Sequence, residues 1–205
     1  SFVMATAIWL AIQFLSRVMR PMMIIFLVVV GFGLVYTFSM DVVIPIVDKT
    51  LRSALQYRSD GIGILAGGSQ MGIQLEAANY VLFLANYMHS YLGNLIGPLP
   101  WHVHSATTLI VFFIEALPMI LILSFLWMKH AWLTKVQGFI LTQAFVWNGL
   151  IAITNDNIGT ALRLRAIAFI LILLTFVVMY SRYRIERTEE VSAPRLMPMM
   201  HLSKK

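Results

Sequence analysis

The sequence predicts an all-α, polytopic bundle of transmembrane helices. Of the 205 residues, 60% are hydrophobic and only 12% are charged, whereas roughly 25% of residues are charged in soluble domains. The mean hydropathy is +0.82, and the apolar residues gather in runs that approach the length needed to cross a bilayer. We expect about five spans and an amphipathic external helix. They form a single transmembrane domain over residues 1–181, followed by a basic cytoplasmic tail over residues 182–205.

Composition also limits what the protein binds. Because the chain has no cysteine, it lacks disulfides, iron–sulfur clusters and thiolate zinc sites. The net charge of +6 and the pI near 9.8 come mostly from basic residues at the ends of apolar runs. That pattern is typical of a membrane surface rather than of nucleic-acid binding. We therefore expect membrane lipids among the partners and no nucleic acid, and we predict no cofactor and no metal.

Five apolar runs are the candidate spans. The first is short for a full crossing, so part of that helix is expected to precede Ser1. Arg17 and Arg20 separate the first two runs, and the tail is basic as well. Because Lys and Arg concentrate in cytoplasmic loops, both stretches are expected inside and the N-terminus outside, with a disordered tail. The five runs are residues 2–15, 22–40, 104–128, 138–154 and 166–180.

Residues 41–103 form the expected external segment. Residues 41–60 are predicted to be a surface helix with Leu51, Leu55 and Tyr57 toward the bilayer. Residues 61–72, with five glycines, are predicted to form a flexible hinge or lid. Residues 74–96 show two faces at helical spacing, which indicates a helix in the membrane interface or along a cavity. The tyrosines favour an interfacial belt, with a sugar platform as the alternative. The polar face comprises Asn79, Asn86, Ser90 and Asn94, and the apolar face Tyr80, Leu84, Tyr87, Tyr91 and Leu95.

Glu115 is a carboxylate inside an apolar run. Ionisable groups within a membrane are costly, so such a residue is a functional-site hypothesis. The alternative is a structural glutamate that locks helix packing through Gln143 or Asn148. His104 shares its helical face toward the outer surface, and we take Glu115 and His104 as candidate catalytic residues. The pair His102 and His104, without cysteine or a nearby carboxylate, is too small a set to predict a metal site.

Arg163 and Arg165 belong to a polar island, residues 155–165, between the last two runs. On the predicted topology this island is external, where Lys and Arg are usually scarce. The planar fork of arginine suits phosphate and carboxylate, so an anion site is expected there, with snorkelling to lipid headgroups as the alternative. Residues two apart on a helix point about 200° from each other, so only one arginine should face a pocket. Thr160 is the expected helix cap.

Several short motifs resemble a known class of membrane proteins. They are GPLPW at residues 97–101, Glu115 within a span, NIGT at residues 157–160, and Arg163 with Arg165. Together, over roughly residues 40–185, they resemble the C-terminal half of bacterial oligosaccharide repeat-unit polymerases and O-antigen ligases. The resemblance implies a metal-independent glycosyltransferase that uses an undecaprenyl-diphosphate-linked glycan at the outer face of the cytoplasmic membrane. Such proteins usually have many more spans, so this chain would be a fragment, an oligomer or a reduced relative.

Two other classes of function stay open. One is a non-catalytic membrane subunit that packs lipids, partner helices or further copies of the chain. The other is a small transporter with Glu115 as an ion relay, which internal repeats would favour, and the sequence shows none. For the enzyme hypothesis the lipid-diphosphate contacts are Arg163, Arg165, Arg52 and Arg58, and the cavity-lining residues are Trp101, Asn79, Asn86 and Asn157.

Overall fold

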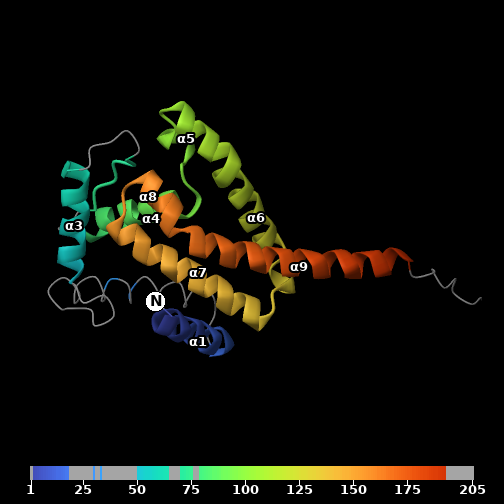
Figure 1. Cartoon of the computed structure of the whole chain (residues 1–205). Helices are drawn as coiled ribbons and strands as arrows, with labels where there is room; N and C mark the ends of the chain where they lie inside the picture. The colour runs from blue at the N-terminus through green and yellow to red at the C-terminus, as the bar shows by residue number, and fades with distance from the viewer. Residues whose placement is uncertain are drawn as a thin grey trace, which may run out of the picture.

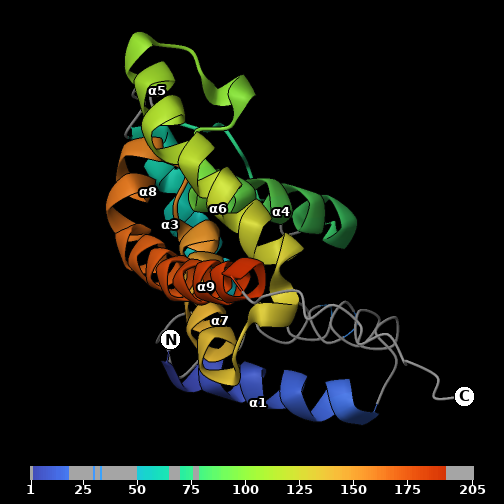
Figure 2. The same ribbon diagram turned by 90° about the vertical axis from the view of Figure 1, so that its right-hand side faces the viewer.

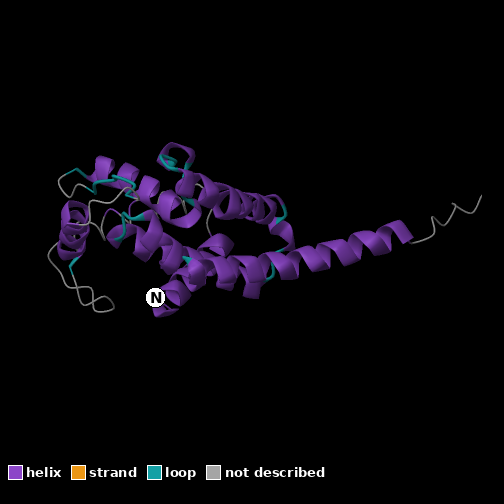
Figure 3. Ribbon diagram, turned by 45° about the horizontal axis from the view of Figure 1, so that its top comes forward, coloured by secondary structure: helices purple, strands orange, loops and turns teal. Residues whose placement is uncertain are grey.

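The computed structural model describes residues 2–18, 30, 33, 50–64, 70–75 and 79–192 (Figure 1). Every regular element in these residues is a helix, and one isolated bridge joins Gln70 to Asn157 (Figure 3). The all-α prediction is therefore confirmed for the described part of the chain. The second expected span, residues 22–40, lies outside it except for Val30 and Gly33.

Three described helical segments are long and apolar enough to cross a membrane. They are Ala106–Met128, Lys135–Thr154 and Ala166–Thr188, and the apolar helix Phe2–Ser16 is shorter. These features mark a membrane protein, and the described residues contain three candidate spans rather than the five that were expected. The first span consists of α5 (Ala106–Val111), a π-helical turn η2 (Phe112–Ala116) and α6 (Leu117–Met128). The others are α7 (Lys135–Thr154) and the first part of α9 (Ala166–Ser192).

Helix α7 is the centre of the packing. It contacts α1 (Phe2–Val18), α3 (Leu51–Ile64), α4 (Tyr80–Ile96) and α9. Figure 1 shows α7 and α9 diverging from one end, where the short helix α8 (Ile158–Leu164) joins them, and Figure 2 shows α1 crossing below α7. The main apolar core lies between α4, α6, α7 and α9 and comprises Leu95, Met119, Leu126, Leu141, Ala144, Ala168, Ile172 and Met179.

Capping residues set where the spans begin. The Ser105 side chain accepts a hydrogen bond from the Thr108 backbone N–H at the start of α5. Thr134 does the same for the backbone N–H of Gln137 at the start of α7. Both are reciprocal capping boxes, which satisfy N–H groups that a helix leaves unpaired. Short 3₁₀ turns, η1 (Pro100–His102) and η3 (His130–Trp132), precede these caps.

Helix α3, which includes part of the surface helix predicted over residues 41–60, does not have the predicted environment. Leu51 and Leu55 are buried against Phe83 of α4, so the prediction that they face the bilayer is wrong. Helix α3 also continues through Gly61 to Ile64, although residues 61–72 were expected to form a loop. The apolar contact with Phe83 explains the burial of the two leucines.

The tyrosines of α4 turn toward α7 rather than forming an exposed belt. The hydroxyl of Tyr87 donates to the Gly149 carbonyl at 3.0 Å, and that of Tyr91 donates to the Phe145 carbonyl at 3.2 Å. Both bonds fix one face of α4 against the last turns of a candidate span. The helix itself begins at Tyr80, capped by Asn79, and so is shorter than the predicted residues 74–96.

The last helix is longer than its apolar run. We predicted an end near residue 180 and disorder from residue 182, but α9 continues to Ser192. The prediction of disorder is wrong for residues 182–192, and residues 193–205 lie outside the described part. Tyr183 explains part of this continuation, because its ring packs on Phe125 and Trp132 and lies under the Lys129 ammonium.

Candidate functional site

Helix α8 separates two groups of polar residues. Asn157, not the expected Thr160, caps this helix, because its side chain accepts from the Thr160 backbone N–H at 3.1 Å. Helical spacing places Thr160 and Leu164 on one face and Ala161 and Arg165 on a neighbouring one. A pocket adjoins the first face, and a buried ion pair adjoins the second.

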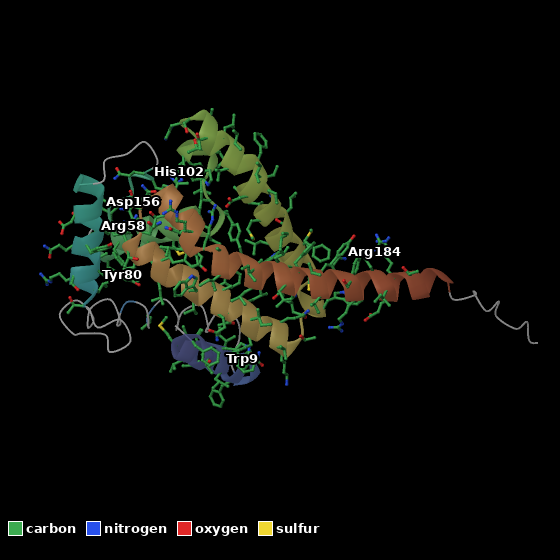
Figure 4. The ribbon with its side chains drawn as sticks, viewed as in Figure 1. Trp9, Arg58, Tyr80, His102, Asp156 and Arg184 are labelled. Atoms are coloured by element: carbon green, nitrogen blue, oxygen red, sulfur yellow. The ribbon has the colours of Figure 1, made fainter. Side chains whose placement is uncertain are left out.

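Arg58 and Asp156 form the more buried pair, beside the pocket (Figure 4). Arg58 Nη2 lies 2.6 Å from Asp156 Oδ1, and the two side chains are only 1% and 4% exposed. Each of the three Arg58 nitrogens also donates to a nearby oxygen other than Asp156. Nε and Nη2 reach the Ile73 carbonyl, and Nη1 reaches the Ser90 hydroxyl and the carbonyls of Ala152 and Asn155.

Asp156 is equally well satisfied. Its Oδ1 accepts from the Ile73 N–H and its Oδ2 from the Gly72 N–H, both at 3.0 Å, while its backbone carbonyl accepts from Met71. Burial raises the pKa of Asp156, and the charge of Arg58 and these hydrogen bonds oppose that shift. The pair therefore joins α3, the segment 71–73 and the end of α7 into one unit.

Two asparagines extend this network to α4. The Asn155 amide donates to Asn94 Oδ1 at 2.7 Å, and the Asn94 amide donates to the Ser90 carbonyl at 2.8 Å. Ser90 and Asn94 are fully buried. The polar face of α4 that was expected at an interface or a cavity thus packs, at these two positions, against the end of α7.

The pocket beside this network has a volume of about 210 Å³. Its walls come from α3, the bridge residue Gln70, the end of α7 and the exposed face of α8. The lining residues are Tyr57, Arg58, Gly61, Gln70, Thr154, Asn155, Asp156, Asn157, Thr160 and Leu164. The pocket is therefore rich in amides and hydroxyls, and it lies where the span Lys135–Thr154 ends.

Arg165 and Glu115 form the second pair. Arg165 Nη2 donates to Glu115 Oε2 at 2.9 Å, and Nη1 donates to the Gly97 carbonyl. The Arg165 side chain is fully buried and lies over the Phe169 ring, whereas 37% of the Glu115 side chain is exposed. Arg165 Nε is buried and has no acceptor among the described residues. The prediction that Glu115 has a polar neighbour is confirmed, but the neighbour is Arg165 rather than Gln143 or Asn148.

Local structure gives Glu115 its position. It lies in the π-helical turn η2, one turn before Pro118, and such turns are frequent at functional sites.

The structure separates residues that the sequence placed near this site. Arg163 is exposed while Arg165 is buried, which confirms that the two arginines diverge. His104 is exposed and precedes α5. Glu115 lies nine residues beyond the start of α5, roughly 13 Å along the helix, so His104 does not share its site.

The other predicted site residues are dispersed. Arg52 is exposed on α3, and Asn79 caps α4. Asn86 donates to the Gln74 carbonyl at 2.8 Å, and the Trp101 indole N–H donates to His89 Nε2 at 2.9 Å. Of the four predicted cavity-lining residues, only Asn157 lines the described pocket.

Sequence reasoning missed Asp156 and Tyr57, which line the pocket, and His89. Asp156 was detectable, since it is the one acidic residue in the polar island at residues 155–165. Its partner Arg58 was assigned to an anion site, but the carboxylate and carbonyl acceptors already occupy its nitrogens. Nothing in the sequence pairs residues that lie 98 positions apart.

His102 is a third buried polar side chain. It is 4% exposed, its ring stacks on His89 with centroids 5.2 Å apart, and neither ring nitrogen has a partner in the described structure. Burial, followed by the charges of His89 and His104, lowers the pKa of His102 to about 4. No group of three or more His, Cys, Asp or Glu that could hold a metal occurs among the described residues.

The two sides of α8 therefore differ in chemistry. The Arg58 side has a satisfied ion pair next to a polar pocket, and the Arg165 side has a buried cation that orients an accessible carboxylate. The first arrangement suits binding of a polar molecule, and the second suits proton transfer. No family model, no curated protein and no solved structure matches the chain.

Proposed function

We propose that this chain is a membrane protein of bacterial surface-glycan assembly that acts on an undecaprenyl-diphosphate-linked glycan at the outer face of the cytoplasmic membrane. The observation that carries the proposal is the Glu115 carboxylate. It lies nine residues into the candidate span Ala106–Met128, is 37% exposed, and is held by an arginine that is itself fully buried. A carboxylate in such a place suits a general base.

The reaction would be a glycosyl transfer without a metal. Glu115 takes the proton from a hydroxyl of the acceptor sugar, and the oxygen forms a bond to C1 of the donor glycan. The bond from C1 to the diphosphate oxygen breaks, and undecaprenyl diphosphate leaves with the electron pair. Arg165 is a positioning residue in this scheme, because its side chain is buried and its bonds go to Glu115 and Gly97.

Contact with the diphosphate falls to Arg163. Its side chain is exposed on α8, two residues before Arg165, and its planar fork suits phosphate oxygens. Arg52, exposed on α3, is a second candidate for this contact. Arg58 and Arg165 are bound to internal acceptors, so neither is free for the lipid.

Charge distribution supports this orientation. Basic residues occur at the other end of the spans, at Lys129, Lys135, Arg182, Arg184 and Arg187, and Figure 4 places Arg184 far along α9 from Arg58 and Asp156. Lys and Arg near span ends favour the cytoplasmic side. The end with Glu115 and the pocket is then external, where lipid-linked glycans are assembled in the proteins that the motifs resemble.

The test is a Glu115→Gln variant in the source bacterium with its own gene copy deleted. Glutamine keeps an acceptor for Arg165 but cannot take the proton, so glycan product should fall about 100-fold or more while membrane-inserted protein stays constant. Glu186→Gln, an exposed acid of α9, is the matched control and should keep full product. Full product from a well-inserted Glu115→Gln protein would contradict the proposal.

A second candidate function is a non-catalytic membrane subunit. The observation that favours it is the mutual neutralisation of Arg165 and Glu115, since such pairs also fasten helices together. In that case Arg165→Met should lower assembly of the complex, and Glu115→Gln should have little effect on glycan product. The two functions thus differ in which member of the pair matters more.

A further inference from the structure

We propose that the pocket beside the Arg58–Asp156 pair binds one uncharged sugar unit of the substrate. The pocket adjoins the face of α8 next to the one that carries Arg165, and this assignment of its ligand rests on the proposed function.

The charged side chains at the pocket already form hydrogen bonds to groups inside the protein. Among the described residues that line the pocket, Arg58 and Asp156 are the only charged ones, and each nitrogen of Arg58 donates to an internal acceptor within 3.1 Å. Both oxygens of Asp156 accept hydrogen bonds as well. A phosphate or a uronate would have to displace these bonds and approach Asp156, so a neutral ligand is favoured.

The walls suit a molecule with many hydroxyls. Gln70, Asn157, Thr154 and Thr160 bring amide and hydroxyl groups to the pocket, and such groups donate and accept in the patterns that polyols need. Tyr57 adds an aromatic ring that is 63% exposed. An aromatic ring beside polar groups offers an apolar surface for the C–H face of a sugar.

The size limits the ligand to one unit. A volume of about 210 Å³ is below the roughly 300–1,000 Å³ of pockets that enclose drug-sized ligands. There is open space beside Gly61, because a Cβ built on this residue meets nothing within 4 Å. Because Gly61 lines the pocket, we expect a large side chain at position 61 to fill part of it.

The place of the pocket defines its role. Leu164 lines the pocket while the next residue, Arg165, contacts Glu115, so the two sites lie on different, neighbouring faces of α8, about 100° apart around its axis. The bound unit is thus not the one that reacts at Glu115. The pocket is a specificity subsite that selects a neighbouring sugar of the glycan.

The test is saturation-transfer NMR on the purified full chain in lipid nanodiscs. The probes are methyl glycosides of glucose, galactose and N-acetylglucosamine, with methyl glucuronide and inorganic pyrophosphate as charged comparisons. We expect a signal from at least one neutral glycoside that falls at least fivefold in Gly61→Trp. Gln56→Trp, an exposed position on the same helix, is the matched control and should keep the signal.

Two outcomes would overturn the inference. One is no neutral signal that depends on position 61, and the other is competition for the same Gly61-dependent site by pyrophosphate or methyl glucuronide. Failure of the proposed function gives a different result. If Glu115→Gln leaves glycan product intact but the Gly61-dependent sugar signal remains, catalysis is rejected and the sugar site stands; the reverse result rejects only the sugar site.

Discussion

The two buried arginines, Arg58 and Arg165, differ in how completely the protein satisfies them. All nitrogens of Arg58 have acceptors, and its carboxylate partner is 4% exposed. Arg165 is as deeply buried, but its Nε has no acceptor in the described structure and its partner Glu115 is 37% exposed. A fully satisfied pair fastens the fold, whereas a pair with one accessible member leaves a group that can react.

The locations of the pairs add to this contrast. Arg58 connects α3, segment 71–73 and the ends of α4 and α7, so its loss would separate several elements. Arg165 connects the start of α9 to a π-helical turn and to the Gly97 carbonyl. The first pair should therefore dominate stability, and the second should dominate activity.

The largest expected effect is from Arg58→Met. It leaves Asp156 buried without its charge partner, which costs about 3–5 kcal/mol of unfolding free energy. Detergent-denaturant unfolding of the purified chain measures the loss. The double variant Arg58→Met with Asp156→Leu should lose less than the sum of the single variants, and simple additivity would contradict a coupled pair.

Arg165→Met should destabilise less, by about 1–3 kcal/mol. The reason is that its partner Glu115 is 37% exposed, whereas the carboxylate partner of Arg58 is almost fully buried. The same unfolding assay decides the order of the two variants. A loss equal to or larger than that of Arg58→Met would break the distinction between them.

His102 sharpens the comparison as a buried imidazole whose ring nitrogens have no hydrogen-bond partner among the described residues. Its pKa is lowered from 6.5 to about 4, so the unfolded state takes up a proton that the folded state refuses. Its contribution to stability is present above pH 6.5 and is lost as the pH falls toward 4. His102→Phe should flatten this part of the stability profile, and an unchanged slope would count against a neutral, buried imidazole.

The smallest expected effect is a gain in stability. Gly61 is helical, and a Cβ there meets nothing within 4 Å, so Gly61→Ala should stabilise the chain by up to about 1 kcal/mol. The variant should also keep the sugar signal that Gly61→Trp removes. Destabilisation by alanine would show that the wall beside Arg58 is more crowded than described.

Local patterns predicted the directions of side chains better than their partners. Helical periodicity correctly separated Arg163 from Arg165, and the cost of an intramembrane carboxylate correctly required a polar neighbour for Glu115. The identity of that neighbour depends on how α8 and α9 meet η2, which no local rule supplies. For the same reason, the sequence did not predict the Arg58–Asp156 pair or the burial of Leu51 and Leu55. Both depend on contacts between segments that are distant in the sequence.

The most direct measurement is carboxylate footprinting of the unmodified chain in nanodiscs. A carbodiimide and an amine label accessible carboxyl groups, and peptide mass spectrometry compares the rates at Glu115 and Asp156. If the Arg165–Glu115 pair is reactive and the Arg58–Asp156 pair is structural, Glu115 is labelled in the folded protein and Asp156 is labelled only after unfolding. Equal labelling rates, or faster labelling of Asp156, would contradict the difference between the two pairs.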